Sequence, residues 1–149
     1  MWVQGVVAVL LVGVAANPLA PAQGSTSLAP SQSNAYVVDV PLTTALPNFE
    51  LSEFQHPELV DARAAAFLQA VRTVYGATLT LTDDARTPGE NETLPGAAKE
   101  SLHLKGTAFD LKPLPSVQHL YRFTQAVVTV AAAWGVTVEL GVYSGANGH

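Results

Sequence analysis

Hydrophobic side chains recur every three or four residues in two stretches of the chain, as expected for helices with one buried face. The first stretch follows Pro57, a residue favoured in the first turn of a helix, and ends before Gly76. Its apolar positions are Val60, Ala64, Phe67, Val71 and Val74. The second stretch lies between Ser116, a helix-capping residue, and Gly135. Its apolar positions are Leu120, Phe123, Val127, Val130 and Trp134. The spacing predicts two amphipathic helices.

Alternating apolar and β-branched residues predict the strands. Residues 77–82 alternate strictly and predict a strand whose partner is 107–111, while 136–140 predict a third strand and 35–47 a weak edge strand. Residues 83–100 contain two Pro and two Gly and predict a long, functional loop. The order helix, strand, loop, strand, helix, strand predicts an α+β domain with helices packed on a small, mostly antiparallel sheet.

An apolar run from Val6 to Ala16 precedes the first charged residue, Asp39. It is shorter than the roughly 20 residues that span a bilayer. Because Ala20-Pro21-Ala22 offers a small-x-small cleavage site, residues 1–22 are expected to be a secretory signal peptide, and the mature protein to lack a membrane span. The alternative is that Val6 to Ala16 forms a buried strand or helix of the domain.

Composition divides the rest of the chain and excludes several functions. Residues 23–48 are rich in Pro, Ala, Ser and Gln and are expected to be a flexible spacer before a single domain at 49–149. The net charge of −5 and the scattered Lys and Arg argue against a nucleic-acid partner. Cysteine is absent, so any metal must be held by His, Asp or Glu. The sequence does not indicate an oligomeric state.

The stretch Ser101 to Asp110 carries the residues with the clearest chemistry. His103 and Asp110 are suitable zinc ligands, and Gly106 between them allows the chain to bend so that the two side chains converge. Small Ala108 would leave room near a metal. Taken alone, such a pair is more often a surface histidine and a strand-end aspartate without a metal.

The whole pattern Ser-x-His-x-x-Gly-x-Ala-x-Asp resembles the metal motif of zinc D-alanyl-D-alanine carboxypeptidases and murein endopeptidases, a family that is similar in fold to the Hedgehog signalling domain. Further matches lie on either side. Upstream, residues 79–88 resemble the family's strand that ends in an Arg-Thr turn, here Arg86-Thr87, and Asn91 follows. Downstream, 141–143 followed by His149 is similar to the closing strand with its third ligand.

The resemblance implies one Zn²⁺ per chain, held by His103, Asp110 and His149, with a fourth position open to water. It implies that Arg86 faces the substrate, either its carboxylate or the oxyanion formed during attack, and that Ser101 orients a ligand or the substrate. The implied activity is hydrolysis of D-amino-acid peptide bonds in peptidoglycan stem peptides, by an exported protein of the periplasm, cell wall or medium.

The chain departs from the family pattern in two places. It stops at His149, where family members continue, so either a domain truncated at its C-terminus or an impaired site is expected. No acid matches the family's general base; Glu139 is the carboxylate of the closing segment and is otherwise an exposed strand residue. The alternatives to a peptidase are a non-catalytic cell-wall or peptide binding module on the same fold, or a partial gene product.

The remaining titratable residues have ordinary interpretations. His56 and His119 lie before and early in the predicted helices and are expected at the surface. Three loop glutamates are either solvated or in contact with substrate, namely Glu90, Glu92 and Glu100.

Overall fold

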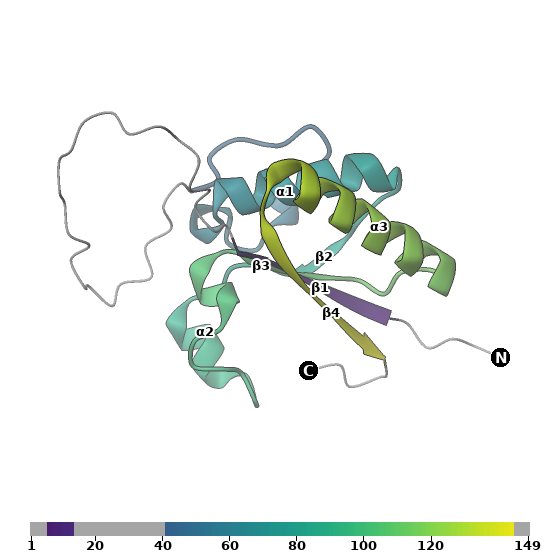
Figure 1. The fold of residues 1–149 in the computed structure, drawn as a ribbon. Coiled ribbons are helices and arrows are strands. Elements are labelled where there is room, and N and C mark those ends of the chain that lie inside the picture. Colours follow the sequence, from purple (N-terminus) through teal and green to yellow (C-terminus); the bar gives the residue numbers. More distant parts are fainter. Residues whose placement is uncertain (1–5, 14–40, 145–149) are drawn as a thin grey trace.

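An antiparallel sheet organises this computed structural model, which describes residues 6–13 and 41–144 (Figure 1). Its strands are β1 (Val6–Gly13), β2 (Leu81–Asp83), β3 (Ala108–Leu111) and β4 (Thr137–Ser144). The strand order is β2-β3-β1-β4, and each pairing is antiparallel. Together with the helices, this confirms the predicted α+β class.

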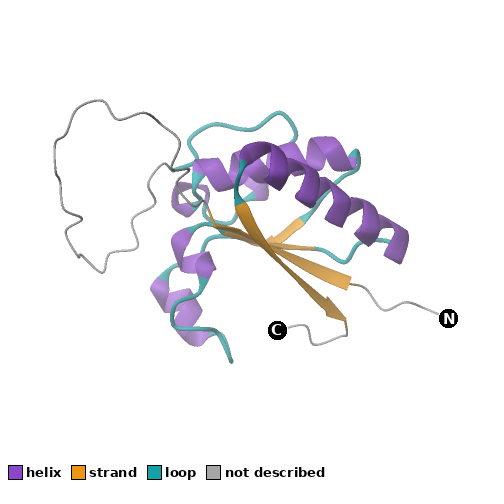
Figure 2. Cartoon of the chain, viewed as in Figure 1, coloured by secondary structure: helices purple, strands orange, loops and turns teal. Residues whose placement is uncertain are grey.

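Two helices cover one face of the sheet, namely α1 (Ala62–Tyr75) and α3 (Val117–Trp134) (Figure 2). Both end at a glycine in the left-handed region, Gly76 and Gly135, where a side chain would be strained. Ser116 caps α3 by accepting a hydrogen bond from a backbone N–H of the first turn. Both predicted helices and their glycine ends are confirmed, but α1 begins at Ala62 and not at Pro57, which starts a separate 3-10 turn.

The core lies between these helices and the sheet. Phe109 and Leu111 of β3 are fully buried there, against Phe67 and Leu68 of α1 and Phe123 of α3. Burying a side chain of this kind contributes about 1.5–3 kcal/mol, so these residues stabilise the two layers. Because side chains alternate along a strand, the other residues of β3 face away from the helices.

Two of the predicted core positions are more exposed than the helical spacing implies. Val74 is 53% exposed and Trp134 is 45% exposed, although the Trp134 ring makes an edge contact with Phe67. Both lie in the last turn of their helix. No described helix is both long and apolar enough to cross a membrane.

The predicted loop at 83–100 contains a short helix, α2 (Pro88–Thr93), which lies on the opposite side of the sheet from α1 and α3 (Figure 1). Thr87 and Glu90 form a capping box that starts it. The strand predicted at 77–82 is displaced to β2, because the strand forms only where it can pair with β3. β2 does pair with β3, as predicted.

Three 3-10 turns complete the described elements: η1 (Leu51–Glu53), η2 (Pro57–Leu59) and η3 (Leu102–Lys105). The predicted edge strand at 35–47 is not formed over 41–47, where only isolated bridges occur; residues 35–40 lie outside the described residues. The expected spacer also differs over 41–48, because Leu42 is 4% exposed and donates its backbone N–H to Val60 O. Residues 23–40 lie outside the described part.

The apolar N-terminal run contributes an inner strand of the sheet. β1 pairs with β3 over Val9–Leu11 and with β4 along its whole length, so it joins two strands that do not pair with each other. This is the alternative of a strand within the domain, and it differs from a segment that is only a signal peptide. Cleavage of residues 1–22 stays a prediction, and it would remove this strand.

We predict that Val9→Pro destabilises the full-length chain, because Val9 is paired on both sides and proline removes a backbone donor from the ladder. A loss of about 1–3 kcal/mol in the free energy of unfolding is expected, because the carbonyl that faced the lost N–H has no partner. Val9→Ile, which keeps the N–H, is the matched control in a denaturant titration. Equal stability of the two variants would show that β1 is not part of the folded domain.

Gly106 fixes the η3 turn against the start of α1. Its φ is +66°, and a Cβ built on it would lie 2.0 Å from Leu59 O. Its carbonyl accepts a hydrogen bond from Asp61 N at 3.0 Å. The glycine is therefore required by this close packing as well as by the bend between His103 and Asp110.

Gly106→Ala should lower the free energy of unfolding by about 2–4 kcal/mol, from left-handed strain together with the overlap with Leu59. Gly89→Ala is the control, because nothing lies within 4 Å of a Cβ at that position. Thermal or denaturant unfolding of the two variants provides the measurement. Similar stabilities would contradict the close approach of η3 to η2.

Candidate metal centre

The imidazole of His103 is held in one orientation by the end of β2. His103 lies in η3 and is 6% exposed. Its Nδ1 hydrogen-bonds the backbone carbonyl of Asp84. A carbonyl can only accept, so the proton is on Nδ1, and the lone pair on Nε2 is left to bind a cation.

Asp110 presents a carboxylate oxygen to that free nitrogen. It lies on β3, on the face away from the two large helices, and Oδ1 is 3.5 Å from His103 Nε2. This oxygen is buried and has no hydrogen-bond partner among the described residues. An unpaired buried oxygen is costly, so a cation beside it would be favourable.

The separation of these two atoms fits a shared metal ion. Zinc binds imidazole nitrogen and carboxylate oxygen at about 2.0–2.2 Å, so two ligands of a tetrahedral ion lie about 3.4 Å apart. The observed 3.5 Å agrees with that value. The third expected ligand, His149, lies outside the described residues, within which no group of three suitable side chains gathers.

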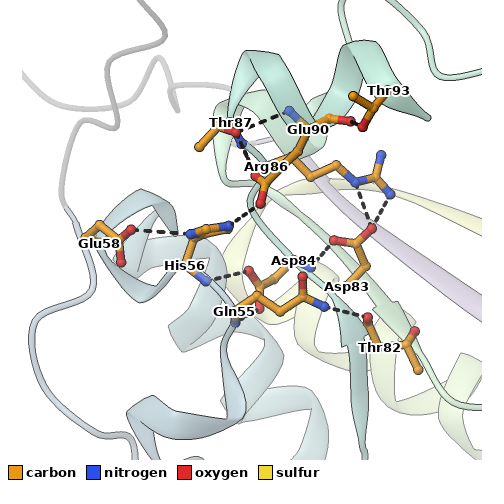
Figure 3. Close-up of polar contacts among 10 residues, drawn as sticks. All are labelled: Gln55, His56, Glu58, Thr82, Asp83, Asp84, Arg86, Thr87, Glu90 and Thr93. Atoms are coloured by element: carbon orange, nitrogen blue, oxygen red, sulfur yellow. Dashed lines mark hydrogen bonds and ion pairs between the residues drawn. The ribbon is translucent and has the colours of Figure 1, made fainter.

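Arg86 lies beside the same carboxylate. Its Nη2 is 3.7 Å from Asp110 Oδ2, its side chain is 16% exposed, and its backbone N–H donates to His103 O at 3.0 Å. Asp83 Oδ2 accepts from Arg86 Nε at 2.7 Å and also from Nη2. The guanidinium is therefore fixed at the edge of the candidate site, as Figure 3 shows for its contacts with Asp83.

Ser101 acts on the backbone of the site in this structure. Its Oγ accepts from His103 N at 3.3 Å and so caps η3. Glu139 is exposed on β4 and lies on the same face of the sheet as Asp110. Asp110 is paired with Val9 and Glu139 with Leu11, and these two residues of β1 are two positions apart and so face the same side. Glu139 is two strands away from Asp110 and two residues further along, which is roughly 12 Å at the usual strand dimensions.

Asp84 connects the site to the segment before α1. It is fully buried, and its carboxylate accepts from Gln55 N at 2.7 Å and from His56 N at 3.3 Å. Burial raises the pKa of this carboxyl above its usual value, although the backbone donors act in the opposite direction. Sequence reasoning missed Asp83 and Asp84. The available signal was a pair of acidic residues between a strand and Arg86.

A second polar cluster joins η2 to α2 (Figure 3). His56 Nε2 is 2.8 Å from Glu90 Oε1, and His56 Nδ1 is 3.4 Å from Glu58 Oε1. The expected surface position of His56 is therefore a paired one, with a quarter of its side chain exposed. His119 Nδ1 lies 2.9 Å from Ser116 Oγ, at the N-terminus of α3 and away from the site.

A cavity of about 570 Å³ adjoins α2. It mixes apolar and charged side chains, and two of its residues, Pro88 and Leu104, stand within two positions of Arg86 and His103. The lining residues are Pro88, Asn91, Glu92, Leu94, Ala97, Lys99 and Leu104. The segment predicted to be functional therefore encloses a space close to the candidate ligands.

Comparison with known proteins identifies a family for the chain. The family model described as Peptidase M15 matches residues 46–139, which include Arg86, Ser101, His103 and Asp110. No curated protein and no solved structure matches the chain. Because the match covers more than half of the sequence, the chain belongs to the Peptidase M15 family, a family of cell-wall zinc peptidases.

Proposed function

We propose that this protein is a zinc metallopeptidase that hydrolyses D-amino-acid-containing peptide bonds of peptidoglycan stem peptides, as a carboxypeptidase or an endopeptidase. The family is zinc-dependent in general. The observation that carries the proposal is the unpaired Asp110 Oδ1 facing His103 Nε2 at 3.5 Å. Export to the periplasm, cell wall or medium belongs to the same proposal, because the substrate lies there.

His103, Asp110 and His149 would hold one zinc ion per chain. Bound zinc supplies a Lewis acid for the scissile carbonyl and lowers the pKa of a bound water toward 7. The Asp84 carbonyl fixes the tautomer and the ring orientation of His103, which ligand histidines require. Ser101 holds the backbone of the same turn.

Arg86 would bind the substrate. A guanidinium beside the ligand carboxylate is suited to pair with a peptide carboxylate or with the oxyanion of the tetrahedral intermediate. Asp83 holds two of its nitrogens, so the fork is oriented before substrate arrives. The cavity next to α2 offers space for the neighbouring part of a stem peptide.

We expect about one zinc per chain in the purified full-length protein, because these ligands define one site. His103→Ala should abolish stoichiometric binding by removing a ligand. His119→Ala is the control, since His119 contacts Ser116 and not the site. Elemental analysis after dialysis measures the zinc, and a stoichiometric content in His103→Ala would refute the assignment.

Activity is tested by release of D-alanine from a stem pentapeptide and by digestion of sacculi, which distinguish carboxypeptidase from endopeptidase. Arg86→Ala should lower kcat/KM by about 10²–10³-fold while zinc content is unchanged, because the guanidinium that pairs with the substrate carboxylate or the oxyanion is lost. Arg86→Lys, which keeps the charge and loses the fork, should recover part of the activity. A zinc-loaded wild type that is inactive on both substrates would instead indicate a binding module.

A further inference from the structure

His56 lies between carboxylates from two separate elements. Glu58 belongs to η2 and faces Nδ1 at 3.4 Å, while Glu90 belongs to α2 and faces Nε2 at 2.8 Å. The backbone N–H of His56 donates to Asp84 Oδ1 at 3.3 Å. Figure 3 shows the ring bridging the gap between the two elements. Neither the metal ligands nor the proposed chemistry uses this histidine.

Glu90 transmits this contact to the segment that carries Arg86. Its Oε2 accepts from Thr87 N and from Thr87 Oγ1, each at 2.8 Å, and so closes the first turn of α2. Thr87 follows Arg86 directly, and Arg86 N is bound to His103 O. A restraint on Glu90 is therefore a restraint on the backbone next to Arg86.

The same histidine is also linked to the metal-ligand side of the site. Asp84 accepts from the His56 backbone through its carboxylate and from His103 Nδ1 through its carbonyl. The η2 segment is thus connected to His103 in η3 through Asp84, and to the backbone next to Arg86 through Glu90. Loss of the His56–Glu90 contact would break the connection to Arg86 and leave the connection to His103 intact.

We propose that His56 is a positioning residue that ties α2 to η2 through Glu90 and thereby sets the placement of Arg86 relative to His103. The tie is a property of the fold; only its effect on substrate rests on the proposed function. Because Arg86 is proposed to bind substrate, a released α2 raises KM more than it lowers kcat, and leaves the metal ligands in place.

The tie depends on pH through the groups that face the ring, which are Glu58, Glu90 and the Asp84 carboxylate. The hydrogen bond to Glu90 raises the pKa of His56 above 6.5, against a smaller effect of burial. Hydrogen bonds from Thr87 and His56 lower the pKa of Glu90 from 4.5 to about 2. The stability that protonated His56 gives to the contact is complete below pH 6.5 and is lost as the pH rises through the raised pKa of His56. The stability that ionised Glu90 gives to it is complete above pH 4.5 and is lost as the pH falls toward 2.

The test uses the full-length chain with His56→Gln, Glu90→Gln and the double variant, and His119→Gln as the matched control. Amide hydrogen exchange of residues 87–93, corrected for intrinsic rates and compared with α3, is measured at pH 5.5 and pH 8.5. In the wild type and the control, protection of 87–93 should fall about two- to fivefold between these values, as for a partly exposed ion pair. In each single variant the protection of 87–93 should be low at both pH values. In the double variant it should be no lower than in the single variants.

Catalytic and metal measurements separate this proposal from the proposed function. His56→Gln should raise KM for a stem peptide two- to fivefold at pH 5.5, with kcat and zinc content nearly unchanged. If the wild type has no hydrolytic activity, the hydrogen-exchange result still tests whether His56 ties α2 to η2. Protection of 87–93 in His56→Gln that equals the wild type at both pH values would overturn this tie, as would an equal loss in His119→Gln.

Discussion

The hydrogen bond between His103 Nδ1 and the Asp84 carbonyl is the contact on which the candidate site depends, because it decides which ring nitrogen can bind a cation. Asp84 in turn is fixed by burial and by two backbone donors, Gln55 and His56. The ligand geometry is therefore built from the junction between the end of β2 and the segment before α1. A metal site needs such support, since a ligand left to choose its own orientation binds weakly.

The alternation of β3 allows one strand to serve both the core and the site. Phe109 and Leu111 pack under the helices, while Ala108 and Asp110 face the other side, where η3 and α2 lie. The core contacts thus fix the position of Asp110 without using its side chain. His103 and Arg86 come from turns that are held to each other by the bond from Arg86 N to His103 O. The rigid sheet and two linked turns together bring the three side chains close.

Local patterns in the sequence were sufficient for the helices and for the pairing of β2 with β3, because capping residues, glycine stops and side-chain periodicity act over a few residues. The same was not true of Val6–Gly13, since a short apolar run looks alike in a signal peptide and in an inner strand. The motif placed His103, Asp110 and Arg86 in one site. It could not reveal Asp84 or His56, whose roles arise from contacts across more than 18 residues of chain, such as the one between His56 and Glu90.

The position of a bound metal ion is the most direct measurement of whether this pair of side chains forms a metal centre. A crystal structure of the zinc-loaded full-length protein, with anomalous data at the zinc edge, should show one peak within about 2.2 Å of both His103 Nε2 and Asp110 Oδ1. A peak bound through His103 Nδ1, or one located away from Asp110, would contradict the site described above.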